Sequence, residues 1–354
     1  MSLIRNPNEV YIIAEIGQNH NGDIEIAKKL IDQLDRYTYD PVTGNRLYKP
    51  NAIKLTKRDL DEELTLDAAS KPYIGPNSFG KTYGEHREFL ELSYEEHVQL
   101  GDYARSRGFD FIVTACSPRA TSIFDMVKVD YIKVASRDLT NIPLLYKLSV
   151  REEPIIISTG MATEQELETA LEVLSDTKIS ILHCISEYPA KFSNLNLNSI
   201  NWLLDKYNSK YSIGYSDHSL GSSSPLIAVA LGANIIEKHV TLDTNMKGSD
   251  HKGSADIETF HKMTNNIRLA EISLGVSSFL TDKSFIKNTK LKLQRSLCYN
   301  KDIRSGTVVT LDDLHMLSPG DGLSWDKKES VLGKVLKKNV NKNTLVSIED
   351  YEKS

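Results

Sequence analysis

The sequence predicts an α/β fold, a (β/α)8 TIM barrel followed by a small β-rich domain. Short, nearly continuous apolar segments recur eight times, which is typical of parallel strands buried on both faces. Segments with helical spacing of apolar residues separate them, and eight is the number of strands that closes this barrel. An open doubly wound sheet is the alternative, but no phosphate-binding GxGxxG motif follows a strand, which weakens it.

The strands are expected where β-branched and other apolar residues cluster between turn-forming residues. In chain order these segments are residues 10–17, 52–55, 109–115, 130–136, 154–160, 179–185, 211–217 and 234–242.

Helix signals lie between these strands. Thr163 and Glu166 have the spacing of a capping box before a run of apolar residues at i, i+3, i+4 and i+7, and Ser93 and Glu96 repeat it. Asp23 can cap a helix that begins at residue 24. The long polar segment 37–93, which surrounds the second strand, is expected to form extended loops on the barrel rim.

Domain boundaries follow from a change in composition near the C-terminus. The alternation of apolar strand segments with helical segments ends near residue 275, which predicts a catalytic domain over 1–275 and a linker over 276–290. Short strands and turn residues then predict a small β-rich domain over 291–354.

Composition limits the function classes. The 354 residues carry a formal net charge of -5, and no Lys/Arg-rich run is present, so neither nucleic acid nor a membrane surface is an expected partner. The first residues lack the apolar region of a signal peptide, and we expect a cytoplasmic protein. The three cysteines are far apart and form no CxxC pair, which favours reduced, buried thiols.

Polar side chains recur at the carboxyl ends of the expected strands, where catalytic residues of a TIM barrel lie. Each has a structural explanation when taken alone, but their joint occurrence at one rim indicates an active site. The candidates are Glu15, Lys54, Thr56, Lys133, Ser136, Ser158, His183, Ser186, Tyr188, Ser216, Asp217, His218, Glu237 and His239.

Lys54 and Lys133 are unusual because they belong to strands whose side chains should be buried. A buried ammonium group requires an acidic partner or an anionic ligand. With nearby hydroxyl donors, a phosphate or carboxylate ligand would fit. Salt bridges to Glu15, Asp138 or Glu237 are the purely structural alternative.

His218 and His239 end adjacent strands and could bind a divalent metal together. Imidazoles beside carboxylates and water suit Mn, Zn, Fe or Co better than Ca. A pair of proton-transferring histidines is the main alternative. In the segment that contains His239, alternation places Glu237 on the same face and Lys238 on the opposite one, where we assign it no role.

These residues, in this order, resemble the N-acetylneuraminate (sialic acid) synthase family. The resemblance runs through most of the chain and rests on AEIGQNHNGD (14–23), IKL (53–55), IKVAS (132–136), IIISTGM (155–161), LHCISEYPA (182–190), GYSDHSLG (214–221), IEKHVTLD (236–243), GSDHKGS (248–254), RSL (295–297) and LSPGDGLS (317–324).

The resemblance implies a TIM barrel with an antifreeze-like (SAF) domain, which condenses phosphoenolpyruvate with an N-acylated mannosamine-type sugar such as N-acetylmannosamine. The products would be N-acetylneuraminate, or a related nine-carbon keto acid, and phosphate. It also implies a divalent metal on His218 and His239, most often Mn²⁺ with Mg²⁺ or Co²⁺ possible, and a domain-swapped homodimer.

The resemblance also assigns roles to single residues. Glu15, His218 and His239 would be catalytic, and the phosphoenolpyruvate site would comprise Lys54, Lys133, Ser136, Ser158 and Ser216. Tyr188 and Asp250 would face the sugar with Glu15, while Thr56, Asp138 and Ser186 complete the expected substrate-binding set. Arg295 would reach into the partner's barrel and contact the sugar's N-acyl group.

The sequence departs from the family pattern at Thr56, at Ser186 and in TACSP (114–118), which leaves the acceptor sugar open. A metal-dependent aldolase or isomerase on the same barrel is the alternative among enzymes. A non-catalytic carbohydrate- or ice-binding protein is disfavoured, because the C-terminal region carries many charges.

Overall fold

The computed structural model describes residues 9–46 and 49–352, which form two compact units, Met1–Gly275 and Val276–Ser354. Among the described residues, no helix has the length and apolar character needed to cross a membrane.

The first unit is a closed parallel barrel, which confirms the predicted fold class. Each strand pairs with the next in the chain, and β1 pairs with β8 to complete the ring. The strands are β1 (Tyr11–Gly17), β2 (Ala52–Lys57), β3 (Asp110–Ala115), β4 (Tyr131–Val134), β5 (Ile155–Ser158), β6 (Ile179–Cys184), β7 (Ser212–Asp217) and β8 (Ile235–Thr241), with a short β9 (Ala255–Asp256) beside β8.

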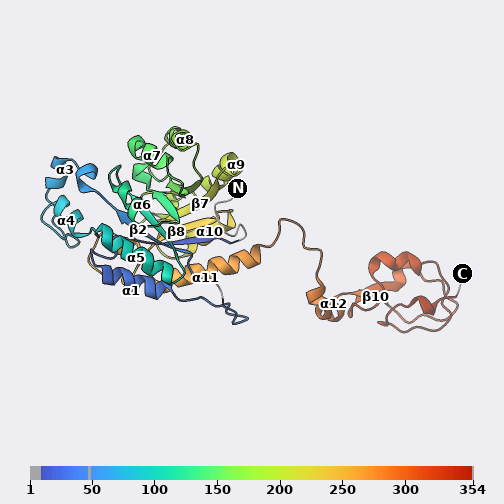
Figure 1. Cartoon of the computed structure of the whole chain (residues 1–354). Helices are drawn as coiled ribbons and strands as arrows, with labels where there is room; N and C mark the ends of the chain where they lie inside the picture. The colour runs from blue at the N-terminus through green and yellow to red at the C-terminus, as the bar shows by residue number, and fades with distance from the viewer. Residues whose placement is uncertain (1–8, 47–48, 353–354) are drawn as a thin grey trace. The chain divides into compact units, whose positions relative to one another are not determined.

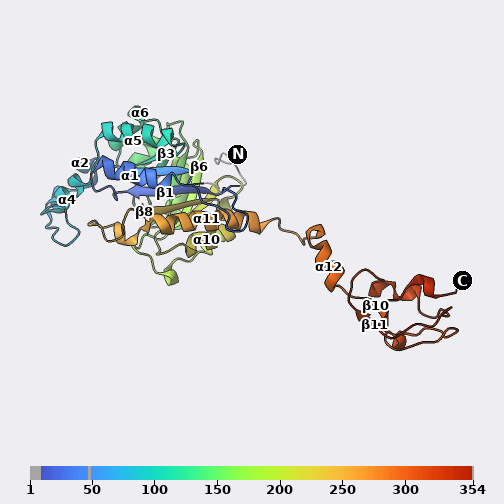
Figure 2. The ribbon, with the colours of Figure 1, turned by 90° about the horizontal axis from the view of Figure 1, so that it is seen from below.

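Helices cover the outer face of the barrel (Figure 1). Figure 2 shows α10 and α11 beside each other next to β8. The helices of this unit are α1 (Ile24–Leu34), α2 (Leu60–Glu63), α3 (Leu66–Ser70), α4 (Tyr83–Phe89), α5 (Tyr94–Ser106), α6 (Ile123–Met126), α7 (Ile142–Ser149), α8 (Glu164–Val173), α9 (Ser199–Tyr207), α10 (Ser223–Ala230) and α11 (Ile257–Leu274).

The predicted helix starts are confirmed by their caps. Asp23 accepts a hydrogen bond from the backbone N–H of Glu25, and both capping boxes form, at Ser93 with Glu96 and at Thr163 with Glu166. The prediction of extended loops over 37–93 was partly wrong, because α2, α3 and α4 lie there. A capping box at Thr82 and Glu85, which the sequence analysis did not identify, begins α4.

Two apolar layers follow from the alternation of side chains along each strand. Outward residues pack against the helices in a large core, whereas a small cluster fills the barrel interior. The interior cluster comprises Tyr11, Ile13, Ala52, Ile112, Tyr131, Ile156, Leu182 and Ile235. On β1, Ile13 is followed on the same face by Glu15, and on β8 Ile235 is followed by Glu237 and His239. The apolar cluster therefore fills the barrel interior beneath the polar residues at the carboxyl ends of the strands.

The second unit contains an antiparallel pair, β10 (Ser296–Tyr299) and β11 (Leu314–Leu317), which matches the predicted small β-rich domain. Leu297, Tyr299 and Val309 belong to its separate apolar core. The helix α12 (Lys287–Leu293) precedes β10 and begins inside the segment expected to be a linker.

Candidate active site

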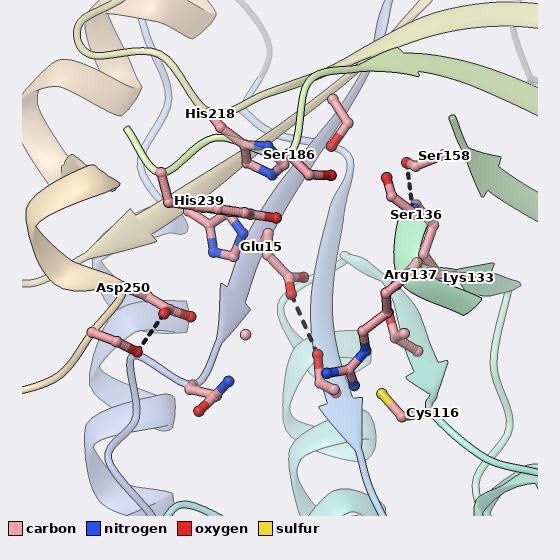
Figure 3. Close-up of a pocket in the computed structure, with 18 of the residues that line it drawn as sticks. Glu15, Cys116, Lys133, Ser136, Arg137, Ser158, Ser186, His218, His239 and Asp250 are labelled. Atoms are coloured by element: carbon pink, nitrogen blue, oxygen red, sulfur yellow. Dashed lines mark hydrogen bonds between the residues drawn. The ribbon is translucent and has the colours of Figure 1, made fainter. Parts of the chain in front are cut away.

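A cavity of about 360 Å³ opens at the carboxyl ends of the barrel strands. Thirteen of the expected site residues line it: Glu15, Lys54, Thr56, Lys133, Ser136, Ser158, Ser186, Tyr188, Ser216, His218, Glu237, His239 and Asp250. They come from seven of the eight strands, or from the segments that follow those strands, so closure of the barrel is what brings them together (Figure 3).

Four expected residues do not line the cavity: His183 on β6, Asp217 on β7, Asp138 and Arg295. Ser136–Asp138 form a turn of 3-10 helix after β4, and the Asp138 carboxylate accepts a hydrogen bond from Arg137 Nε at 3.3 Å. Asp138, which the resemblance places in the substrate-binding set, instead pairs with Arg137 in this turn. Arg295 belongs to the second unit.

The deepest part of the cavity holds two lysines and two carboxylates. Lys54 Nζ lies 2.9 Å from Glu15 Oε2 and 3.6 Å from Glu237 Oε2, and Lys133 Nζ lies 4.0 Å from Glu237 Oε1. Lys133 also donates to Ser158 Oγ at 2.6 Å, and Ser216 Oγ donates to Glu237 Oε1 at 3.0 Å. Two of the three salt-bridge partners considered for the lysines are therefore present, and Asp138 is not one of them.

The two carboxylates have different environments. Burial raises the pKa of Glu15 although Lys54 opposes it, whereas Lys133 and Lys54 outweigh burial and hold the pKa of Glu237 low. One oxygen of each carboxylate, Glu15 Oε2 and Glu237 Oε2, is buried with no hydrogen-bond donor other than the facing ammonium of Lys54. Among the described residues, Lys54 is therefore the main partner of both oxygens.

His218 and His239 lie together, with ring centroids 5.6 Å apart, and Tyr188 packs against both rings. His218 Nδ1 lies 2.9 Å from the carbonyl oxygen of Ile185, so it donates there and leaves its Nε2 with a free lone pair. Burial lowers the pKa of His239, which favours its neutral form, and its buried Nδ1 has no hydrogen-bond partner among the described residues.

Contacts with Cys184 and the carbonyl oxygen of Ile185 outweigh burial and raise the pKa of His218, so a cation would compete with a proton there. Two imidazoles in this arrangement fit a divalent cation when both are deprotonated. A carbonyl that fixes the tautomer of a ligating histidine is a common feature of metal sites. Within residues 9–46 and 49–352, no cluster of three His, Cys, Asp or Glu side chains forms a metal site, so water or substrate would supply the other ligands.

Lys238 was assigned no role from the sequence, but it is fully buried on the outer face of the barrel. Its Nζ contacts the carboxylate of Asp217 and donates to the carbonyl oxygen of Ser219 at 2.7 Å. Asp217 Oδ1 also accepts from Tyr215 Oη at 2.9 Å and from Ser224 Oγ at 3.0 Å. This ion pair joins β7 to β8 directly behind the two histidines.

The sequence analysis missed three arginines that line the cavity, Arg58, Arg87 and Arg137. Arg58 and Arg137 lie just beyond the ends of β2 and β4, where strand alternation no longer fixes the direction of a side chain. Arg87 lies on α4, inside the segment expected to be loop, and no periodic pattern indicates it.

The chain is similar to known proteins over most of its length. The NeuB family model matches residues 47–278, and the SAF domain model matches residues 294–352. The chain is 34% identical to the N,N'-diacetyllegionaminic acid synthase of Campylobacter jejuni, over 95% of this chain and 98% of that one. It is 31% identical to the N-acetylneuraminate-9-phosphate synthase of Drosophila melanogaster, over 95% and 94% of the two chains.

Among solved structures, the N-acetylneuraminic acid (sialic acid) synthetase of Leptospira borgpetersenii superimposes with a TM-score of 0.67 and 30% identity. The match covers 80% of this chain and 91% of that one.

Proposed function

This chain belongs to the NeuB family and carries a SAF domain, and from that premise we propose that it is a nonulosonate synthase. The reaction would join phosphoenolpyruvate to an N-acylated mannosamine-type sugar, with N-acetylmannosamine the simplest candidate, and release phosphate. The observation that carries the proposal is the convergence of two lysines, two carboxylates and two histidines in one cavity.

Phosphoenolpyruvate would occupy the deepest part of the cavity. Lys54 and Lys133 offer buried ammonium groups, and Ser136, Ser158 and Ser216 line the same region. Binding of a small, dense anion here would not require a positively charged protein surface, which agrees with the formal net charge of -5.

The sugar would lie nearer the mouth, between the histidine pair and Asp250. His218 and His239 would hold one divalent cation, most suitably Mn²⁺, which when bound supplies Lewis-acid polarisation of the open-chain aldehyde. Tyr188 would pack against the sugar beside the two rings, and Asp250 would accept a hydrogen bond from a sugar hydroxyl.

Carbon–carbon bond formation would leave positive charge on C2 of the former phosphoenolpyruvate. Water would then add to C2, and phosphate would leave with its bridging oxygen by cleavage of the C2–O bond. Glu15 is the candidate for this step, because it lines the cavity and burial raises its pKa to about 7, near that of an effective general base. Its carboxylate would orient the water and accept the proton, or would stabilise the charge at C2.

Release of phosphate tests the proposal. The purified chain with Mn²⁺ and phosphoenolpyruvate should release phosphate and form a keto acid when a suitable acceptor sugar is added. An aldolase or isomerase would act on its sugar without phosphoenolpyruvate. Absence of release with N-acetylmannosamine, its 6-phosphate, mannose and diacetamido-trideoxyhexoses would contradict the proposal.

We also propose that the active form is a domain-swapped homodimer. In this arrangement Arg295 of one subunit would contact the N-acyl group of the sugar bound in the other barrel. The resemblance in sequence supports this proposal, and mixed-dimer kinetics test it.

A further inference from the structure

The segment between β8 and β9, residues 242–254, carries Asp250 to the mouth of the cavity. We call it the Asp250 segment. Most of its residues are partly or fully exposed, and the buried ones are Gly248, His251 and Ser254. A segment with so little buried surface opens easily unless specific contacts hold it. Those contacts should therefore involve the three buried residues.

His251 is buried next to Asp250, and both of its ring nitrogens have partners. Nδ1 lies 2.7 Å from Thr241 Oγ1 on β8, and Nε2 lies 3.1 Å from Asn21 Oδ1 in the loop after β1. Burial lowers the pKa of His251, which favours the neutral ring. An amide oxygen only accepts hydrogen bonds, so Nε2 donates to Asn21 and Nδ1 accepts from the hydroxyl of Thr241.

Asn21 extends this contact to a second point of the Asp250 segment. Its Nδ2 donates to the carbonyl oxygen of Lys247 at 3.0 Å. Its backbone has a φ of 51°, in the left-handed region that costs free energy for a residue with a side chain, although Asn tolerates it better than most. Asn21 therefore joins the loop after β1, the strand that carries Glu15, to the segment that carries Asp250.

Gly248 lets the Asp250 segment lie directly against the ring of His251. A Cβ at this position would lie 2.7 Å from His251 Cδ2 and 2.9 Å from His251 Nε2, so any side chain there would displace the ring. The φ of Gly248 is 145°, which also favours glycine. The close approach of segment and ring thus depends on this residue.

A second set of hydrogen bonds reaches the backbone of Asp250 itself. The buried Asn19 donates through Nδ2 to the carbonyl oxygen of Val240 and to Ser254 Oγ, both at 2.8 Å. Ser254 Oγ in turn donates to the carbonyl oxygen of Asp250 at 2.7 Å. The loop after β1 therefore holds Asp250 through two buried residues, His251 and Ser254.

We propose that His251 and Asn21 are positioning residues that hold Asp250 where it meets the acceptor sugar. This inference rests on the proposed function, which makes Asp250 a sugar contact. Neither His251 nor Asn21 lines the cavity, so both would act through Asp250. Because β1 carries Glu15, the same contacts fix the bound sugar relative to the candidate catalytic carboxylate.

Asn21→Gly tests the contact without adding backbone strain, since glycine adopts a positive φ readily. If the closed position of the segment falls to about a tenth of its occupancy, the KM of N-acetylmannosamine should rise about tenfold. The kcat and the KM of phosphoenolpyruvate should stay nearly unchanged. Asn196→Gly is the matched control, because Asn196 also has a positive φ, of 42°, and its exposed side chain donates to Ser199 Oγ. Equal sugar KM values in the two variants overturn the proposal.

Two conservative variants of His251 separate positioning from a purely structural role. The amide nitrogen of Gln can occupy the place of Nε2 and keep the bond to Asn21, whereas the shorter Asn reaches only the place of Nδ1. His251→Gln should therefore retain a lower KM for the sugar than His251→Asn. Equal values, with melting temperatures lowered alike, would reduce His251 to a packing residue and overturn the proposal.

Hydrogen exchange separates this inference from the proposed function. In the full chain without substrate, amides of residues 242–250 should exchange about tenfold faster in Asn21→Gly and at the original rate in Asn196→Gly. Local opening is expected because the N–H of Gly248 still donates to Asn77 Oδ1 at 3.4 Å in the variant.

Faster exchange with no condensation of any sugar would support the positioning contact and contradict only the proposed function. Condensation of N-acetylmannosamine with unchanged exchange in Asn21→Gly would support the proposed function and overturn this inference.

Discussion

Lys238 and Asp217 form a buried ion pair that joins β8 to β7 on the outer side of the barrel. Each is the chain neighbour of a cavity histidine, Lys238 of His239 and Asp217 of His218. The pair therefore fixes the relative position of the two strands at the level where the imidazoles meet.

Removal of the ammonium group should destabilise the barrel strongly. In Lys238→Met, the Asp217 carboxylate would remain buried without its counter-charge, which costs roughly 3–5 kcal/mol of unfolding free energy. The midpoint of urea denaturation, followed by circular dichroism, measures the loss. Lys206→Met, which breaks an exposed pair with Glu164, should leave the midpoint almost unchanged, and equal shifts in the two variants would contradict the prediction.

Substitution of either cavity histidine should abolish metal binding. His218→Ala and His239→Ala each remove one of the two proposed imidazole ligands, so affinity for Mn²⁺ in calorimetric titration should fall at least about 100-fold, and turnover should be lost. His261→Ala is the control, since His261 lies on α11 and contacts the carbonyl oxygen of Gln33. Full activity after exhaustive treatment with EDTA would reject the metal site.

Replacement of the candidate catalytic carboxylate should reduce turnover and spare binding. Glu15→Gln keeps the size of the side chain but removes its charge, and kcat should fall on the order of 10²- to 10⁴-fold. The KM of phosphoenolpyruvate should change by only a few-fold, because Lys133 and the serines remain. A larger effect on that KM than on kcat would assign Glu15 to binding.

A methyl group at Gly160 should damage the cavity without unfolding the chain. Its Cβ would lie 2.5 Å from Ser186 Oγ, 2.8 Å from Cys184 Sγ and 2.9 Å from Ser136 Oγ. Gly160 N–H also donates to Ser136 Oγ at 3.0 Å, so Gly160→Ala would displace a proposed phosphoenolpyruvate ligand. We expect the KM of phosphoenolpyruvate to rise about tenfold or more with a nearly unchanged melting temperature; an unchanged KM would contradict this expectation.

Mixed dimers test the domain swap. Arg295→Ala should raise the KM of the sugar far more than that of phosphoenolpyruvate. When His239→Ala and Arg295→Ala chains are unfolded and refolded together, a swapped dimer regains one intact site, made from the Arg295→Ala barrel and the arginine of its partner. Separate refolding of the two chains is the control, and absence of any regain in the mixture would reject the swap.

The sequence alone predicted the barrel, because each strand is marked by a short run of consecutive apolar residues and not by contacts with distant segments. Each of the eight expected segments contains the strand later found in it or overlaps most of it, since buried parallel strands are apolar on both faces. The position of polar residues at the carboxyl ends of those strands also predicted that Glu15, Lys54, Lys133 and His239 share one site.

Features that depend on contacts between distant segments were missed. The role of Lys238 required knowledge of what covers the outer face of β8, which no pattern within the strand reveals. The position of Arg87 depends on how α4 folds over the barrel mouth, and that of Asp138 on the turn after β4. Arg87 and Asp138 lie outside the regular strands, whereas the role of Lys238 depends on the segments that pack against its strand.

The opposite charges on the two faces of β8 also bear on how accurately the chain folds. Displacement of this strand by one residue would bring the ammonium of Lys238 into a cavity that already holds two, and would press Glu237 and His239 against the apolar helix layer. Such a shift would leave several buried charges without partners at the same time. The sequence IIEKHVT therefore favours a single register of β8 in the closed barrel.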